Sequence, residues 1–275
     1  MKKKHALDIF LHLVAVVLGI VIIFPLFWVF LSSFKESADI LRFPPRVFPG
    51  AFRTLEQYRI MLSRLPMLTY LKNTLIFAVG ASVLEILFDS MAGYALARFQ
   101  FKGKGIITSL ILSAMMLPFV ITMLPLYVEE FKFGLLDTYA GLIIPRAASA
   151  YGIFMMRSFF ITMPKDLEEA ARVDGMNEFL IYEKIMMPLC KPAIITLFIF
   201  NLTACWNDLL YPLLLTSSSQ MRTISSGLAM FVGSRVNEYG PAMAATVAAL
   251  LPLFIVFLFS QRFFVEGIAV TGMKE

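Results

Sequence analysis

Long apolar stretches alternate with short polar segments along the whole chain. A membrane-spanning helix needs about 20 mostly apolar residues, and the lipid interior offers no partner for backbone polar groups, so such stretches must be helical. The pattern predicts an all-α polytopic membrane protein with one transmembrane domain over residues 1–275. The six stretches that are long enough to be transmembrane helices are residues 7–31, 70–94, 105–128, 139–161, 192–215 and 241–263.

Composition supports this assignment. Of the 275 residues, 59% are hydrophobic and 16% are charged, whereas soluble domains contain about 45–50% apolar residues. The mean hydropathy is +0.78. The apolar run from Ala6 to Leu31 is longer than the roughly 7–15 residues of a signal-peptide core, and no small-residue cleavage site follows it. We therefore expect this run to be retained as the first helix.

Basic residues set the expected orientation. Lys2–Lys4 precede the first span and place the N-terminus in the cytoplasm. Six crossings then return the C-terminus to the same side. The first outer loop, residues 32–69, carries six Lys and Arg residues against this rule, but long loops influence topology less than short ones.

Two local features modify the six-helix plan. After a proline-rich stretch, apolar residues between Leu55 and Leu65 recur at helical spacing. They predict an interfacial helix, which either lies on the membrane surface or shapes the outer entrance. Pro118 and Pro125 fall inside the third span and remove backbone donors, so we expect a bend or break there. Such a bend serves either packing or a cavity that opens and closes.

Residue types for catalysis or metal binding are sparse. Cys190 and Cys205 lack C-x-x-C spacing and are expected to pack as small apolar residues, while His5 and His12 have no ligand-spaced partners. The sequence contains no G-x-x-x-x-G-K-[ST] phosphate-binding loop. It also offers no Ser/His pair and no Cys nucleophile with a base. We expect no catalytic residue, no metal, no cofactor bound by this chain and no nucleic-acid partner.

The most informative polar segment is residues 164–192, between the fourth and fifth spans. Acidic residues follow Pro164 and favour the start of a short helix through the helix dipole. Gly175 suits a left-handed helix end, and Asn177 suits the cap of a second helix. Pro188 then precedes the fifth span. The segment therefore predicts a short helix, a tight glycine turn and a second helix.

The same segment carries a recognisable motif. Its Glu169-Ala170-Ala171, Asp174-Gly175 and later Ile185 and Pro188 resemble the cytoplasmic EAA loop of membrane subunits of bacterial ATP-binding-cassette importers. Met187 stands where that family usually has Leu. Nearly the whole chain is similar to the carbohydrate importers, in particular to the smaller of the two permeases of maltose-type systems. The other segments that carry the resemblance are Gly93–Phe99, Arg157–Phe160, Pro164–Glu168, Trp206–Asp208 with Pro212, Arg222-Thr223, Gln261–Gly267 and Gly272–Lys274.

The resemblance implies a type I importer fold and a set of partners. The chain would join a second homologous permease and two ATP-binding subunits, which use ATP and Mg, in the lipid bilayer of a bacterial plasma membrane. An extracytoplasmic binding protein would deliver the sugar. ATP-driven closure would turn the permeases outward, and hydrolysis would reset them. The residues implied in coupling to the ATPase are Glu169, Ala170, Ala171, Asp174, Gly175 and Pro188.

Three charged residues fall inside the expected spans. A charge near the bilayer centre costs about 2.5–3.5 kcal/mol on insertion scales, so each must face protein or water. Glu85 and Asp89 are four residues apart and share one helix face. They either pair with a neighbouring helix or the partner permease, or line the translocation path. Arg146 lies at a different depth from Glu85, so we expect its partner to be a carboxylate of the other permease, Glu129, Glu130 or an acidic solute.

Polar and aromatic residues of the fifth span suggest a place for the solute. An indole, an amide and a carboxylate are costly in lipid and suit a polyhydroxylated ligand, although packing against the partner permease would explain them equally. The candidate path residues are Trp206, Asn207, Asp208, Tyr211 and Arg146. The rival function is a secondary transporter or channel that uses the intramembrane charges without an ATPase. The EAA-like segment and the lack of a visible two-fold repeat in the sequence speak against it.

Overall fold

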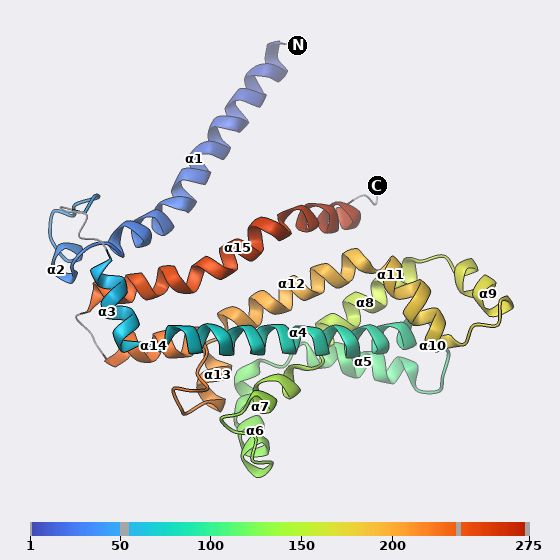
Figure 1. The fold of residues 1–275 in the computed structure, drawn as a ribbon. Coiled ribbons are helices and arrows are strands. Elements are labelled where there is room, and N and C mark those ends of the chain that lie inside the picture. Colours follow the sequence, from blue (N-terminus) through green and yellow to red (C-terminus); the bar gives the residue numbers. More distant parts are fainter. Residues whose placement is uncertain (1, 50–54, 235–237, 273–275) are drawn as a thin grey trace. The chain divides into compact units, whose positions relative to one another are not determined.

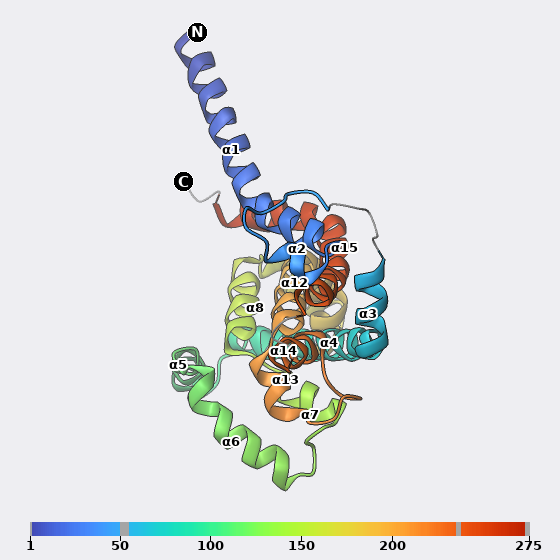
Figure 2. The ribbon, with the colours of Figure 1, turned by 90° about the vertical axis from the view of Figure 1, so that its left-hand side faces the viewer.

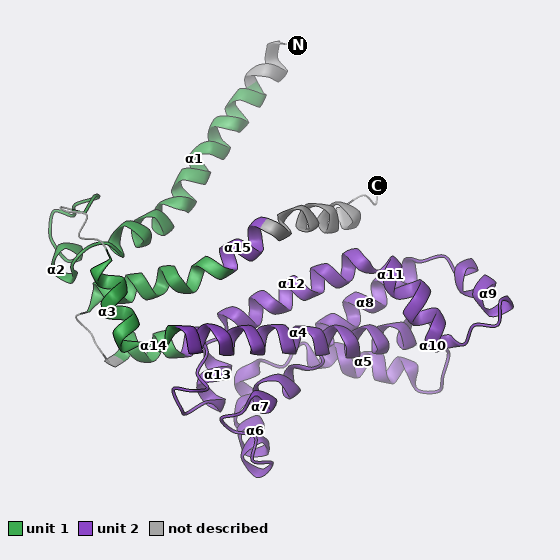
Figure 3. Cartoon of the chain, in the orientation of Figure 1, with its two compact units in different colours: residues 1–67, 227–252 green, residues 68–226, 253–275 purple. Residues whose placement is uncertain are grey.

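A computed structural model describes the backbone of residues 2–49, 55–234 and 238–272. Figure 1 shows a helical chain, in two compact units (Figure 3). Unit 1, residues 1–67 and 227–252, holds α1 (Lys2–Ser32), α2 (Ser37–Ile40), α3 (Glu56–Arg64), most of α14 (Ile224–Ser234) and the first part of α15 (Tyr239–Gly272). Unit 2, residues 68–226 and 253–275, holds α4 (Met67–Arg98), α5 (Lys104–Ala114), α6 (Phe119–Lys132), α7 (Tyr139–Ile143), η1 (Ile144–Arg146), α8 (Ala150–Thr162), α9 (Asp166–Val173), α10 (Glu178–Ile181), η2 (Tyr182–Met186), α11 (Met187–Leu189), α12 (Lys191–Asn207) and α13 (Leu210–Leu215).

Three helices of the described chain are individually long and apolar enough to cross a membrane. They are Leu7–Ser32, Met67–Arg98 and Tyr239–Leu258, and they confirm the first, second and sixth expected spans as continuous helices. Two bent pairs bring the number of candidate spans to as many as five. In one of them α5 and α6 meet at 100°, and in the other the helical segments before and after Cys190 meet at 78°.

The third expected span breaks at the predicted proline. Pro118 is the extended residue before α6, with φ −63° and ψ 138°, and α6 turns away from α5 there (Figure 2). Pro125 lies inside α6, which continues through it. One of the two prolines therefore separates the helices, as expected of a residue that lacks a backbone donor.

The prediction of one continuous fourth helix over 139–161 was wrong. The structure divides this stretch into α7, the short 3-10 helix η1 and α8, and the longest piece has 13 residues. Pro145 stands in the first turn of η1, where its missing N–H ends the preceding helix. Ser149 then starts α8 because its side chain accepts a hydrogen bond from Gly152 N at 2.8 Å. The fifth expected span is also interrupted, at Asp208 between α12 and α13.

Unit 1 contains the helix predicted after the proline-rich stretch. α3 buries Gln57 and Met61 and exposes most of its other residues. Lys35, one of the basic residues of the first outer loop, is 2% exposed. Its ammonium lies 4.3 Å from the centre of the Trp28 ring and donates to the Arg46 carbonyl oxygen at 2.6 Å.

Two apolar clusters form the core of unit 2. The first joins the end of α4 with α8, η2 and the start of α12, around Met156, Phe160 and Met186. The second lies around Phe77, Leu142 and Tyr211, where the rings of Phe77 and Tyr211 stack at 5.8 Å. α8 and α12 lie side by side in both ribbon views (Figures 1 and 2). The two free cysteines are buried, Cys190 in the first cluster and Cys205 in the second.

Candidate functional site: coupling segment and polar cluster

The helix, glycine turn and second helix predicted for residues 164–192 are confirmed. α9 ends at Val173, and Gly175 follows with φ +81°. Gly175 N donates to the Arg172 carbonyl at 3.0 Å and Met176 N to the Ala171 carbonyl at 3.0 Å, the two bonds of a Schellman helix end. A left-handed residue at this position favours glycine because it has no Cβ. The short α9 lies at the end of unit 2 that is remote from α13 (Figure 1).

The second helix begins where the sequence indicated but is irregular. Asn177 Oδ1 accepts a hydrogen bond from Leu180 N at 2.9 Å and caps α10. The chain then passes through one π-helical turn, η2, before α11, which contains Pro188. π-turns within helices are frequent at functional sites. We refer below to residues 164–189, which carry the residues implied in coupling, as the coupling segment.

Most of the implied coupling residues are exposed, and one is not. Ala171 is 4% exposed and packs into the first core cluster of this chain. Its side chain therefore orients α9 against the body of unit 2. The other implied residues, Glu169, Ala170, Asp174, Gly175 and Pro188, are exposed. Leu167 and Val173, which are not among the implied coupling residues, add exposed apolar surface on α9; Val173 is 88% exposed.

An ionic network joins the coupling segment to the C-terminal end of α4. Arg98 Nε lies 2.8 Å from Glu168 Oε1, and the two side chains are 4% and 3% exposed. Glu168 Oε2 lies 3.8 Å from Arg172, whose Nε donates to Glu178 Oε1 at 2.7 Å. Tyr94 OH donates to Glu178 Oε2 at 3.4 Å. Hydrogen bonding to Glu178 raises the pKa of the Arg172 guanidinium, so this network keeps its positive charge.

Three of the five candidate path residues meet in a second polar site. Arg146, from η1, forms an ion pair with Asp208 and lies 4.5 Å above the ring of Tyr211. Asp208 Oδ1 also accepts a hydrogen bond from Tyr211 N at 3.1 Å. The Tyr211 hydroxyl donates to the carbonyl oxygens of Gly141 and Leu142, at 3.0 and 3.2 Å. We call Arg146, Asp208 and Tyr211 the polar cluster.

The partner of Arg146 is therefore a residue that the sequence argument did not consider for this role. The expected partners were a carboxylate of another subunit, Glu129, Glu130 or an acidic solute, whereas the structure gives Asp208 of the same chain. The depth argument assumed continuous helices. Breaks at 144–149 and at 208–209 bring the two residues together.

The remaining two candidate path residues have different environments. Trp206 is 6% exposed and belongs to the second core cluster, and its carbonyl accepts a hydrogen bond from Ser225 Oγ at 3.0 Å. The indole therefore packs inside its own chain, whereas the sequence argument had considered only a solute or the partner permease as its neighbour. Asn207 is exposed, and its side-chain amide donates to the Thr203 carbonyl at 3.0 Å.

Glu85 and Asp89 share a buried face of α4, at 5% and 0% exposure. Asp89 accepts hydrogen bonds from Ser149 N at 2.9 Å and from Ser149 Oγ at 3.0 Å, so it holds the start of α8. This agrees with the pairing alternative for Asp89. Gly152 makes the approach possible, because a Cβ at this position would lie 1.9 Å from Asp89 Oδ2. Glu85 Oε2 is buried without a hydrogen-bond partner among the described residues.

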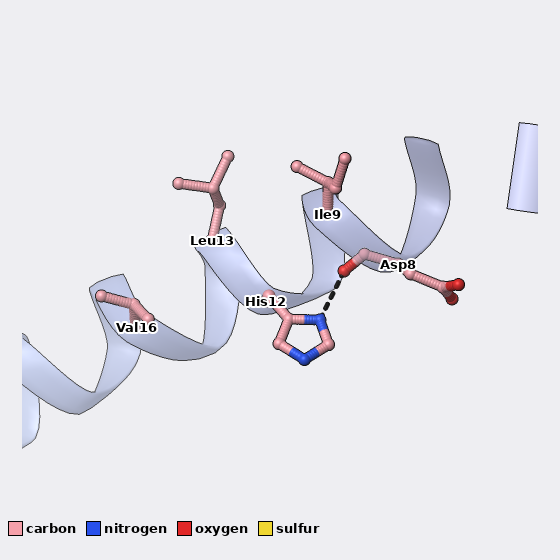
Figure 4. A pocket seen from close by; sticks show the side chains of 5 residues that line it. All are labelled: Asp8, Ile9, His12, Leu13 and Val16. Atoms are coloured by element: carbon pink, nitrogen blue, oxygen red, sulfur yellow. Dashed lines mark hydrogen bonds between the residues drawn. The ribbon is translucent and has the colours of Figure 1, made fainter. Parts of the chain in front are cut away.

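The surface pocket of α1 has no features of a ligand site. Figure 4 shows that its lining comes from one helix, with the Asp8 carboxylate turned away from the His12 ring. His12 Nδ1–H donates to the Asp8 carbonyl of the same helix at 2.7 Å. Over the described residues, no three His, Cys, Asp or Glu side chains form a group that could hold a metal ion.

Comparison with known proteins identifies relatives along almost the whole chain. The arabinooligosaccharides transport system permease protein AraQ of Bacillus subtilis is 35% identical over 273 residues, which covers 96% of this chain and 95% of that protein. The diacetylchitobiose uptake system permease protein NgcG of Streptomyces coelicolor is 32% identical, covering 91% and 84%. The sn-glycerol-3-phosphate transport system permease protein UgpE of Rhizobium meliloti is also 32% identical, covering 98% and 99%.

Solved structures agree on the fold. A chain of a bacterial ABC transporter involved in the import of the acidic polysaccharide alginate superposes with a TM-score of 0.83 at 23% identity, over 96% of this chain and 98% of that one. Residues 89–270 match the family described as binding-protein-dependent transport system inner membrane component. This stretch includes the coupling segment and the polar cluster. The chain belongs to this family of transport permeases.

Proposed function

We propose that this chain is one of two permeases of an ATP-driven carbohydrate importer of a bacterial plasma membrane, with both termini in the cytoplasm. Its partners are a second homologous permease, two subunits that hydrolyse ATP with Mg, and an extracytoplasmic binding protein. Two of the relatives above are named for oligosaccharide or disaccharide uptake and one for sn-glycerol-3-phosphate. The family membership and these names support the proposal.

The observation that carries the proposal is the exposed face of α9. Leu167 and Val173 are 42% and 88% exposed, beside the exposed Glu169 and Ala170. A short helix that buries one face in its own chain and presents apolar and acidic residues on the other suits docking to a soluble subunit. In this proposal Gly175 and Pro188 set the direction of α9 and of the helix that follows it, and Asp174 belongs to the exposed rim.

The polar cluster marks the candidate translocation path. Interrupted helices at membrane depth are tolerated where they are buried in protein or line a water-filled cavity, and both breaks meet at Arg146 and Asp208. Because Asp208 balances the charge of Arg146, this chain offers the solute no net positive charge from that pair. We therefore favour a neutral sugar over a sugar phosphate, with the exposed Asn207 as the hydrogen-bonding group on this chain's side.

The rival, a secondary transporter or channel, needs intramembrane charges that are available for ion coupling. Two of the three charged residues have partners in this chain: Asp89 accepts hydrogen bonds from Ser149 at the start of α8, and Arg146 pairs with Asp208. The proposal of an ATP-driven permease is therefore preferred.

Co-purification with the ATP-binding subunits tests the proposal. The chain is co-expressed with its partner permease and ATPase, purified, and reconstituted with the binding protein for uptake assays. Val173→Asp places a charge in the apolar docking face and should reduce recovery of the ATPase by about tenfold or more, equivalent to ~1.4 kcal/mol. The control is Leu55→Asp, an equally polar change at a 71% exposed site in unit 1. Uptake that needs no ATPase, or equal recovery in the two variants, would contradict the proposal.

A further inference from the structure

We propose that Glu168 is a positioning residue for energy coupling, which makes α9 and the C-terminal end of α4 move as one body. The inference rests on the proposed function in one respect: α9 is taken as the contact with the ATPase. It goes beyond the proposed function by giving Glu168 a role inside the chain. Glu169 faces outward, where a partner subunit can reach it, whereas its neighbour Glu168 is 3% exposed and faces inward.

The burial of Glu168 is not required by helix formation. A carboxylate in the first turn of α9 would be stabilised by the helix dipole while exposed to water. Instead the side chain is desolvated against Arg98, 2.8 Å away and itself 4% exposed. Desolvating two charges costs free energy that their attraction repays only while they stay paired. Separating α9 from α4 would leave Arg98 without its carboxylate, and Glu168 would keep only the longer contact with Arg172 of its own helix, at 3.8 Å.

Further contacts of Arg98 and Glu168 strengthen the connection between α4 and α9. Arg98 also donates to the Met163 carbonyl at 3.0 Å, just after the end of α8. On the other side of Glu168, Arg172 connects α9 to Glu178 of α10. The Glu178 carboxylate also accepts a hydrogen bond from Tyr94, which lies one turn before Arg98 on α4. The network thus returns to the helix on which it started and fixes α9 from both of its ends.

The same helix continues the connection toward the polar cluster. Gly93 of α4 lies so close to α8 that a Cβ there would be 2.8 Å from the backbone nitrogen of Arg157. One turn earlier, Asp89 holds Ser149, at the break between η1 and α8. Arg146, at the end of η1, pairs with Asp208. A displacement of α9 that α4 must follow therefore reaches the helix break at the candidate path.

A distance measurement on otherwise unchanged protein tests the one-body motion. Spin labels are placed at two exposed positions outside the proposed docking face, Lys102 just beyond α4 and Lys165 at the start of α9, in the assembled transporter. Their separation should change by less than about 2 Å between the nucleotide-free and ATP-bound states, the size of a small helix shift. A larger change would overturn the proposal.

A pair of neighbouring substitutions separates this inference from the proposed function. Glu168→Gln should leave ATPase recovery unchanged but lower solute transported per ATP by roughly three- to thirtyfold, the range in which residues along a coupling network act. Glu169→Gln should instead reduce ATPase recovery. If Glu168→Gln keeps the full transport ratio, or loses ATPase as Glu169→Gln does, the positioning role is refuted. If neither variant affects ATPase recovery, α9 is not the docking face. The label distances would then still test whether α9 and the end of α4 move together.

Discussion

The coupling segment and the polar cluster each contain an arginine–carboxylate pair, but this chain buries the two pairs to different extents. The side chains of Arg98 and Glu168 are 4% and 3% exposed, whereas those of Arg146 and Asp208 are 28% and 17% exposed. A dry pair resists separation because each lone charge would remain desolvated. A pair that its own chain leaves partly uncovered can exchange its partner for another polar group at lower cost. The comparison indicates a stiff joint at α9 and an adaptable contact at the candidate path.

The largest effect on stability is expected where Asp89 of α4 contacts the start of α8. Gly152→Ala would place a Cβ 1.9 Å from Asp89 Oδ2, and such overpacking costs about 1–3 kcal/mol. The unfolding temperature in detergent should fall, as measured with a thiol-reactive dye that reports exposure of the buried Cys190 and Cys205.

Gly105→Ala is the matched control for this change. A Cβ at Gly105, which lies in α5, would meet no neighbouring side chain or packed element within 4 Å, so alanine should leave the unfolding temperature equal or raise it. If Gly152→Ala melts at the same temperature as Gly105→Ala, the close approach of Asp89 to α8 is not needed for the fold.

A local change should break the coupling segment with less effect on the rest of the chain. Gly175→Val puts a β-branched residue at φ +81°, a backbone strain of about 1–3 kcal/mol that would misdirect the two helices. ATP-dependent uptake should fall sharply while the protein still inserts in the membrane. Gly105→Val, at an unstrained helical position, should transport normally; equal uptake by both variants would show that the turn geometry is dispensable.

The sequence predicted the coupling segment well because its signals are local. Gly175 and Asn177 specify a helix end and a helix cap through their own chemistry, and both predictions are confirmed. The Arg98–Glu168 pair was missed because nothing local links α4 to α9. In hindsight, Tyr94 with Arg98, and Glu168 with Arg172, are spaced four apart on their helices and could have suggested two facing polar stripes.

The polar cluster was predicted only in part because it depends on helix breaks. Trp206–Asp208 and Arg146 were singled out as candidates, but apolar length was taken as proof of continuous helices. Pro145 and Ser149 carry a stop signal and a cap signal that could have located the break at residues 144–149. The break at Asp208 has no comparable proline, and its pairing with Arg146 depends on tertiary structure.

A double-mutant cycle measures how strongly the polar cluster is coupled. Arg146→Gln, Asp208→Asn and the double variant should show an interaction free energy of about 1–2 kcal/mol, between the values of exposed and fully buried pairs. Reversible unfolding in mixed micelles provides the measurement. The double variant should be more stable than the sum of the single effects implies. Strict additivity would mean that the ion pair does not contribute to the fold.

The smallest effect is expected at the outer part of the coupling network. Arg172 and Glu178 are 41% and 43% exposed, so their pair should contribute only about 0.2–1 kcal/mol. A cycle of Arg172→Gln and Glu178→Gln, compared with one of Arg98→Gln and Glu168→Gln, should give the smaller interaction energy. It should also weaken further at about 1 M salt, where the screening length is about 3 Å. The buried pair should keep its interaction energy in the same salt because little water or counterion reaches it. Equal interaction energies with equal salt dependence would show that the buried Arg98–Glu168 pair and the exposed Arg172–Glu178 pair do not differ in strength or screening.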